Sequence, residues 1–300
     1  MKTLFPDHAG RLLGSALLLV ALAHGGALAQ TQAKKNTGKA AEVLPKVIMA
    51  INEGGAANAD ATDTLFRYQE LTEIVQKSMR VQLIAVAVRD RNKLKVSLKR
   101  HEYGLLLARP NDLPAEAIRD FGYRPVVIAR ESSQAMFIVH KNSPLRTIKD
   151  VKGKTILTPD QYSNIWRIAN AMLRDANINM AGEKVRSMRD QAAIGWSMEN
   201  EFFDVAVVNS VSGVGRSWEK NGHRVIARSR ELPNMPMIAS PQINETQLAA
   251  LRSAMVSLSA SEDGRMILKK VGLTGFQEAS SQVFLDFLKW IGDLEANQNL

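Results

Sequence analysis

The stretch NSPLRTIKDVKGKTILTPDQYSNIWRIAN, residues 142–170, contains a strand pattern that leads through a short polar loop into a helix. The strand pattern KTILTP covers residues 154–159, and a helix is predicted from Ser163 to Ala176. A helix start exposes unpaired backbone N–H groups and the positive end of the helix dipole, so this loop could bind an anion. Strand and helix patterns alternate along the rest of the chain too, which indicates an α/β fold.

The first alternating unit begins at residue 43. Strands are predicted at 43–52, 81–88 and 103–108, with helices at 65–79 and 89–101 between them. Strands and helices in this order, with short connections, favour a parallel sheet with helices on both faces. Ligands of such sheets bind beyond the carboxyl ends of the strands.

A second alternating unit lies between residues 131 and 229. Its predicted elements are strands at 154–159, 183–188 and 204–209 and helices at 163–176 and 191–200. A second unit inserted into the first needs two crossings, and the runs 123–141 and 223–241 suit them. We therefore expect lobe I at residues 43–130 and 230–300, and lobe II at 131–229.

The first 29 residues have the pattern of an export signal. Lys2 and Arg11 supply positive charge, residues 15–23 are apolar, and Ala27-Leu28-Ala29 matches a cleavage site. We expect cleavage after Ala29, followed by a polar linker at residues 30–42. No other window approaches the roughly 18 apolar residues that a membrane-spanning helix needs, so no span is expected in the mature chain.

The composition excludes several classes of site. The chain has no cysteine, which rules out thiol nucleophiles, disulfides and cysteine-bound metals. Its net charge of +9 suits nucleic acid, an anionic membrane surface or acidic small ligands, but export and the lack of a nucleic-acid motif argue against nucleic acid. The five histidines show no metal-ligand spacing, and no catalytic motif is present. We expect neither an enzyme nor a metal or cofactor.

Three segments resemble those of a known family. NSPLRTIKDVKGKTILTPDQ (142–161) resembles the S-x-(I/L)-x-(T/S)-(I/L)-x-D-(L/V)-K-G-K segment of type II periplasmic solute-binding proteins. FFDVAVVN (202–209) and SRELPNMPMIASP (229–241) resemble the G-x-V-D-A strand and the S-x-x-I-P-x-x-P crossing of the phosphate, phosphite and phosphonate subgroup. The resemblance implies the two-lobed type II periplasmic-binding-protein fold, in which each lobe is a mainly parallel sheet flanked by helices and two crossing strands join the lobes.

The resemblance also implies a function. A protein of this family is the periplasmic substrate-binding component of an ABC importer, and it binds a small oxyanion similar to phosphonate, phosphate or phosphite in the cleft between the lobes. Its expected partners are this small anionic ligand and an ABC permease in the inner membrane. The alternatives are an organic carboxylate or sulfonate as ligand, or an exported sensor that signals to a membrane kinase.

Candidate binding residues lie in the loops after three strands. They are Gly55 and Asn58 in the loop 53–60, Arg109 in the loop 109–112, and Tyr162, Ser163 and Asn164 before the helix. Arg109 could bind an oxyanion with two N–H groups or be a surface arginine.

The roles of the remaining residues depend on helix position or on the family pattern. Ser163 could bind the ligand or act only as a helix cap. The helix that follows it should bury its apolar residues and leave Arg167 on another face. By resemblance to the family, Arg189 or Gln191 stands near the position of a ligand histidine. Asp204 matches the carboxylate of the V-D-A strand, although it could instead cap a helix or be a solvated strand end.

Overall fold

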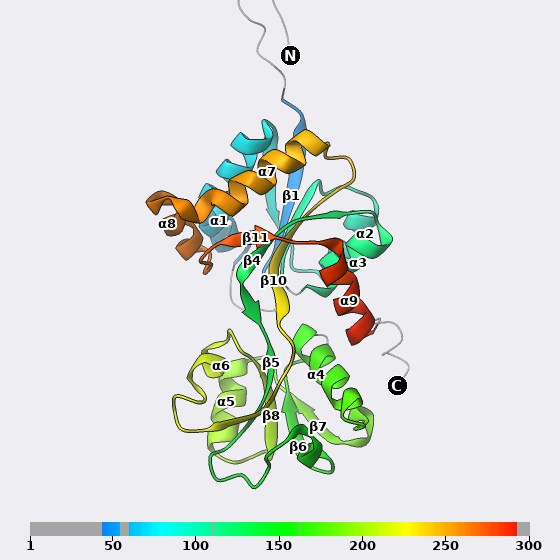
Figure 1. The fold of residues 1–300 in the computed structure, drawn as a ribbon, viewed down its shortest axis with the longest axis vertical. Helices are drawn as coiled ribbons and strands as arrows, with labels where there is room; N and C mark the ends of the chain where they lie inside the picture. Colours follow the sequence, from blue (N-terminus) through cyan, green and yellow to red (C-terminus); the bar gives the residue numbers. More distant parts are fainter. Residues whose placement is uncertain (1–43, 55–59, 110, 162, 293–300) are drawn as a thin grey trace, which may run out of the picture. The chain divides into compact units, whose positions relative to one another are not determined.

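The computed structural model describes residues 44–54, 60–109, 111–161 and 163–292 (Figure 1). Within these ranges the chain forms two β-sheets flanked by helices, and the described residues belong to one compact unit. The helices are α1 (Ala61–Met79), α2 (Arg91–Lys99), α3 (Asp112–Asp120), α4 (Asn164–Asp175), α5 (Gln191–Glu199), α6 (Gly213–Ser217), α7 (Glu245–Ser257), α8 (Glu262–Lys270) and α9 (Ser281–Ile291).

The first sheet has the strand order β11-β4-β10-β3-β1-β2. Its strands are β1 (Lys46–Asn52), β2 (Gln82–Ala87), β3 (Leu105–Ala108), β4 (Arg124–Ser133), β10 (Leu232–Ala239) and β11 (Phe276–Glu278). β1 runs parallel to β2 and β3, whereas β10 is antiparallel to β3 and β4, and β11 is antiparallel to β4. The three strands predicted in the first alternating unit therefore form the parallel part of a mixed sheet.

The second sheet has the strand order β7-β6-β8-β5-β9. Its strands are β5 (Ala135–Val139), β6 (Thr155–Thr158), β7 (Lys184–Ser187), β8 (Val205–Asn209) and β9 (Arg224–Arg228). β6 is parallel to β7 and β8, and β5 is antiparallel to β8 and β9. Here too the predicted strands β6, β7 and β8 form the parallel part, and strands from the crossings complete a mixed sheet.

The chain passes between the two sheets twice. β4 ends at Ser133 in the first sheet and β5 begins at Ala135 in the second. The return runs from β9, which ends at Arg228, to β10, which begins at Leu232. The runs 123–141 and 223–241 are therefore the crossings that the sequence predicts, and each is almost continuous strand.

Apolar periodicity explains the helix α1, which packs on the first sheet. Tyr68, Leu71, Val75 and Met79 are buried at helical spacing in one cluster with residues of β1, β3 and β10. The helix begins at Ala61, four residues before the predicted start, because Asp60 is extended and Asp63 follows in the first turn, where a carboxylate suits the dipole.

The pattern analysis did not predict α3, the helix DLPAEAIRD. It has nine residues, and it buries the carboxylates Asp112 and Glu116 together with Leu113 and Ile118. Buried acidic residues hide the apolar periodicity by which a helix is recognised in a sequence. Pro114 lies in the first turn, where its missing N–H leaves no helix hydrogen bond unmade.

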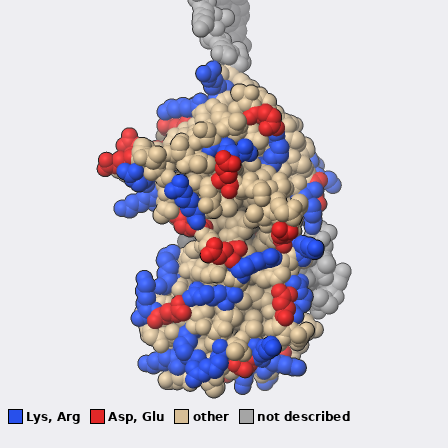
Figure 2. Space-filling model, viewed as in Figure 1, with Lys and Arg blue, Asp and Glu red and all other residues tan. Residues whose placement is uncertain are grey.

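Charge is spread over the surface. On the face drawn in Figure 2, Lys and Arg side chains are interspersed with Asp and Glu. The positive net charge therefore does not gather into one continuous basic patch on that face, which suits a local anion site better than an extended polyanion.

Candidate functional site

The carboxyl ends of β1 and β3 lie side by side in the first sheet. The backbone N–H of Arg109, directly after β3, donates to the carbonyl of Asn52, the last residue of β1, at 2.6 Å. The Asn52 side chain donates to the Val88 carbonyl at 2.7 Å and accepts from the Gly54 N–H at 2.9 Å. These bonds hold the start of the loop after β1, and Gly54 adopts a φ of 71°, which favours glycine.

Glu53 is the centre of a polar group at this edge. Its carboxylate accepts from the Tyr68 hydroxyl at 2.9 Å and pairs with Arg67, and both partners come from α1. Burial, followed by the nearby Glu53 carboxylate, raises the pKa of Tyr68 well above its usual value, although Arg109 and Arg67 act in the opposite direction. The Tyr68 hydroxyl therefore keeps its proton and donates it to Glu53.

Arg109 has unused hydrogen-bonding capacity at the same edge. It lies close enough to Tyr68 to act on its hydroxyl electrostatically. Its Nε atom is buried and has no hydrogen-bond partner in the part of the chain that the structure describes. A buried guanidinium N–H without a partner is costly, so an anion at this position would relieve that cost.

The start of α4 forms the corresponding edge of the second sheet. Ser163 is the N-cap, and its Oγ accepts from the Trp166 N–H at 3.2 Å. Within the described residues, the N–H groups of Asn164 and Ile165 have no hydrogen-bond partner, and the buried Oδ1 of Asn164 also has none. Ser163 is thus a helix cap, as the alternative interpretation predicted, but its hydroxyl hydrogen and two backbone N–H groups remain available to a ligand.

Arg167 occupies a different place from the one expected. Ile165, Ala169, Met172 and Leu173 are buried as predicted, but the Arg167 side chain is buried with them, at 0% exposure. Its Nη1 pairs with Asp112 Oδ2 at 2.6 Å, and this carboxylate is only 1% exposed. The expectation of a separate face was wrong because α3 supplies a carboxylate that neutralises a charge on the buried face of α4.

This ion pair also brings two candidate loops together. Asp112 is the first residue of α3, three residues after Arg109, and Arg167 lies about one helical turn after Ser163. The Asn111 side chain additionally donates to the carbonyl of Pro233 in the crossing strand β10. The loop 109–112, the start of α4 and one crossing therefore meet.

Asp204 lies at the wrong end of its strand to join this group. It directly precedes β8, and its Oδ2 accepts from the Thr155 N–H at 2.8 Å and the Thr155 hydroxyl at 2.7 Å, at the beginning of β6. Partial burial alone would raise the pKa of Asp204, but these hydrogen bonds hold it below its usual value. Ser163 follows the opposite end of β6, so Asp204 lies apart from the start of α4 and is bonded to Thr155 at the start of the strand.

Arg189 lies beyond the carboxyl end of β7, the expected side of the second sheet. Its side chain is 86% exposed, and its Nε lies 3.4 Å from Asp160 Oδ2 in the loop before α4. Asp190 caps α5 through the Ala192 N–H at 2.8 Å. Gly55, Asn58 and Tyr162 lie outside the described residues.

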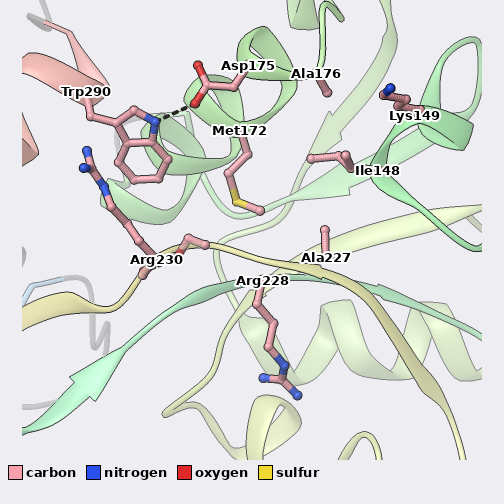
Figure 3. Close-up of a pocket in the computed structure, with 10 residues that line it drawn as sticks. Ile148, Lys149, Met172, Asp175, Ala176, Ala227, Arg228, Arg230 and Trp290 are labelled. Carbon is pink, nitrogen blue, oxygen red and sulfur yellow. Dashed lines mark hydrogen bonds between the residues drawn. The ribbon is translucent and has the colours of Figure 1, made fainter.

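A cavity of about 640 Å³ lies elsewhere (Figure 3). Its lining comes from the 3-10 turn Ile148–Val151, from α4 and Ala176 directly after it, from β9 and the crossing after it, and from α9; it comprises Ile148, Lys149, Met172, Asp175, Ala176, Ala227, Arg228, Ser229, Arg230 and Trp290. None of the candidate residues lines it. We therefore place the candidate site by hydrogen-bonding capacity at the strand ends and not by this cavity.

Sequence patterns missed Glu53, Tyr68 and Asp112. Tyr68 falls on the apolar face of α1, and its ring lies in the core, so nothing in its spacing indicates the hydrogen bond that its hydroxyl makes. Among the described residues, no cluster of His, Asp and Glu could hold a metal ion. Every helix in the described ranges is too short or too polar to cross a bilayer.

Comparison with known proteins identifies one family. Residues 54–284 match the model of a family described as ABC transporter, phosphonate, periplasmic substrate-binding protein. A comparison with curated proteins finds no match.

Similar folds occur among solved structures. A Xanthomonas citri protein bound to ATP has a TM-score of 0.66 and 11% identity, covering 82% of this chain and 96% of its own. PhnD1 of Prochlorococcus marinus, in complex with methylphosphonate, has a TM-score of 0.62 and 13% identity, covering 85% and 98%. The binding protein of an ABC phosphonate transporter from Pseudomonas aeruginosa has a TM-score of 0.58 and 14% identity, covering 82% and 85%. At these identities the likeness shows the fold.

Proposed function

Because the chain belongs to the family of phosphonate ABC-transporter periplasmic substrate-binding proteins, we propose that it binds a phosphonate-like oxyanion, phosphate and phosphite included, for delivery to an ABC permease. The proposal places the ligand between the carboxyl edges of the two sheets. Two observations support it: Arg109 and the start of α4 both have unused donors, and the Asp112–Arg167 pair connects the segments that contain them.

Each edge has a separate role in this proposal. The N–H groups of Asn164 and Ile165 and the Ser163 hydroxyl point donors at the oxyanion, aided by the positive end of the α4 dipole. Arg109 supplies a full positive charge from the first sheet. A doubly charged oxyanion has enough lone pairs to accept from both edges, so its binding would favour the arrangement in which the edges face each other.

The remaining candidates have lesser roles. Gly55 and Asn58 would complete the loop after β1, and Tyr162 would lie directly before the helix start. Arg189 would have to leave solvent and become ordered on binding, which costs side-chain entropy, so its contribution should be small.

The proposed place of action is the periplasm. The family is periplasmic, and the first 29 residues have the pattern of an export signal that would be cleaved after Ala29. The mature protein would thus begin at Gln30 and reach the permease from the outer side of the inner membrane.

Thermal unfolding of the chain from Gln30 with a panel of anions tests this function. The panel contains methylphosphonate, phosphate, phosphite, an alkyl sulfonate and a small carboxylate. A ligand at about 100 times its dissociation constant adds roughly 2.7 kcal/mol to the stability of the folded state, a shift of about 5 to 10 °C for a chain of this size.

The pattern of shifts decides among the alternatives. A rise in melting temperature with phosphorus oxyanions supports the proposal. A rise with the sulfonate or the carboxylate alone would mean that the ligand is of that class and not a phosphonate-like oxyanion. No shift with any member refutes oxyanion binding and favours an exported sensor with a different ligand.

A further inference from the structure

Helix α4 makes a second group of contacts in addition to those with its own sheet. α4 follows β6 and packs on β5 and β8 of the second sheet. Its partners in this group are α3, which it meets through the Arg167–Asp112 ion pair and which packs on β10 of the first sheet, and α9, which packs on α4, α3 and β10. Elements anchored to different sheets are therefore joined here by a route other than the crossing strands.

Polar contacts run along this junction. Arg167 pairs with Asp112 and donates to the Gly292 carbonyl, Arg174 Nη2 donates to the Trp290 carbonyl at 2.9 Å, and the Trp290 indole N–H donates to Asp175 Oδ2 at 2.7 Å. Figure 3 shows the last of these bonds at one end of the cavity, with Arg230 beside the Trp290 ring. We call the group the clasp, defined as Arg167, Arg174 and Asp175 of α4 with Asp112, Trp290 and Gly292.

The centre of the clasp is a fully buried ion pair. Asp112 also pairs with Arg91 Nη1 at 2.9 Å, so two guanidinium groups share one carboxylate oxygen. The other oxygen of Asp112 and the Nε of Arg167 are buried without hydrogen-bond partners among the residues described. A buried ion pair with unmet hydrogen bonds adds little to the net stability of a fold, because desolvation offsets most of the Coulomb attraction.

Such a pair can still determine which arrangement the protein adopts. If the clasp opened, water would hydrate the charges of Asp112 and Arg167, and this hydration would offset part of the lost Coulomb attraction. The outer contacts cost less to break, since the Arg174 and Asp175 side chains are 54% and 51% exposed. The contacts of the clasp thus join the two sheets directly, and breaking them should cost little net stability.

We propose that this clasp holds the two sheets in their present arrangement without help from a ligand, and thereby sets the fraction of the protein that is competent to bind. The part of this inference that concerns binding rests on the proposed function, and the outer contacts of Arg174, Asp175 and Trp290 are not among the residues of the proposed ligand site. If the competent fraction falls, the apparent dissociation constant rises by the reciprocal of that fraction. Weakening the clasp should thus weaken ligand binding without altering any group that touches the ligand.

Distance measurements between two spin labels test the clasp. The chain has no cysteine, so Lys77→Cys on α1 and Glu199→Cys on α5 give exposed, unique labelling positions. Without ligand, the parent should give one narrow distance distribution. Asp112→Asn keeps the shape of the side chain but removes its charge, and it should give a broader and longer distribution.

Two further variants make the result decisive. Arg174→Gln with Trp290→Phe removes the outer contacts from partly exposed positions, and it carries the test if Asp112→Asn does not fold. Glu219→Gln, which breaks the exposed Arg228–Glu219 pair, is the matched control and should leave the distribution unchanged. The proposal is overturned if the ligand-free parent is already broad, or if both clasp variants keep the parental distribution.

Ligand titration separates this proposal from the proposed function. If methylphosphonate binds, Arg174→Gln with Trp290→Phe, which changes no residue of the proposed ligand site, should raise its apparent dissociation constant at least about threefold, and the ligand should narrow the broadened distribution. An unchanged dissociation constant would refute the coupling of the clasp to binding. If no oxyanion binds, the proposed function fails, while the ligand-free distances still decide whether the clasp holds the sheets together.

Discussion

Replacing Ser163 by glycine removes the hydroxyl at the start of α4 but keeps a residue that helix N-termini tolerate. The hydroxyl oxygen accepts from the Trp166 N–H at 3.2 Å, which leaves its hydrogen free to donate to an oxyanion. A hydrogen bond to a charged group contributes about 1.5 to 3 kcal/mol. Ser163→Gly should therefore weaken oxyanion binding about 10- to 100-fold.

The effect on folding should be small and separable. Glycine at an N-cap costs only a few tenths of a kcal/mol, whereas alanine costs about 1 kcal/mol. Ser163→Ala should thus lower the melting temperature by about 2 to 4 °C, and Ser163→Gly by less. Both variants should lose affinity to a similar degree because both lack the hydroxyl.

Ser261 provides a matched control. It caps α8 in the same way, and its Oγ accepts from the Gly264 N–H at 3.0 Å. Ser261→Ala should cost the same stability as Ser163→Ala and leave affinity unchanged. Isothermal titration with the best ligand of the anion panel measures affinity, and calorimetric unfolding measures stability. An affinity of Ser163→Gly within twofold of the parent would refute the assignment of the helix start as the oxyanion site.

Four more substitutions, at three residues, test other contacts of the structure. Arg109→Gln should weaken oxyanion binding at least about tenfold, as measured by titration. Arg109→Lys should keep only part of the parental affinity, because lysine cannot bind an oxyanion with two N–H groups in a fork. Tyr68→Phe should destabilise the fold by about 1.5 to 3 kcal/mol in urea unfolding, since Glu53 loses a buried donor; unchanged stability would contradict that bond. Asp204→Asn should reduce stability at neutral pH. Because the folded-state pKa of Asp204 is lowered, its carboxylate stabilises the parent above about pH 4 and loses this effect as it is protonated. The difference in the free energy of unfolding between parent and variant should therefore shrink as the pH falls below about 4. A difference that stays constant with pH would show that the Thr155 contacts do not need the charge.

The family and the two-sheet fold follow from local patterns. Short apolar runs predicted β6 and β8, and the helix α4 was expected from apolar spacing after a serine cap. These features depend on residues close together in the chain, so one sequence is enough to find them. The polar loop after β6 could likewise be singled out, because strand ends mark ligand sites in α/β sheets.

Partners that are distant in the chain could not be found this way. Asp204 looked available until β6 placed Thr155 beside it, 49 residues away in sequence. Glu53 and Tyr68 carried no motif, and their hydrogen bond exists only because α1 folds back on the end of β1.

The sequence alone determined the alternation of strands and helices, the two crossings and the helix start that could receive an anion, because periodicity and capping are properties of neighbouring residues. Only the tertiary structure decided which charged side chains are buried and which groups they pair with. Arg167 is buried because Asp112, 55 residues away, meets it across the packed helices. A charged side chain can be buried only where the fold brings an opposite charge next to it, and that depends on residues far apart in the sequence.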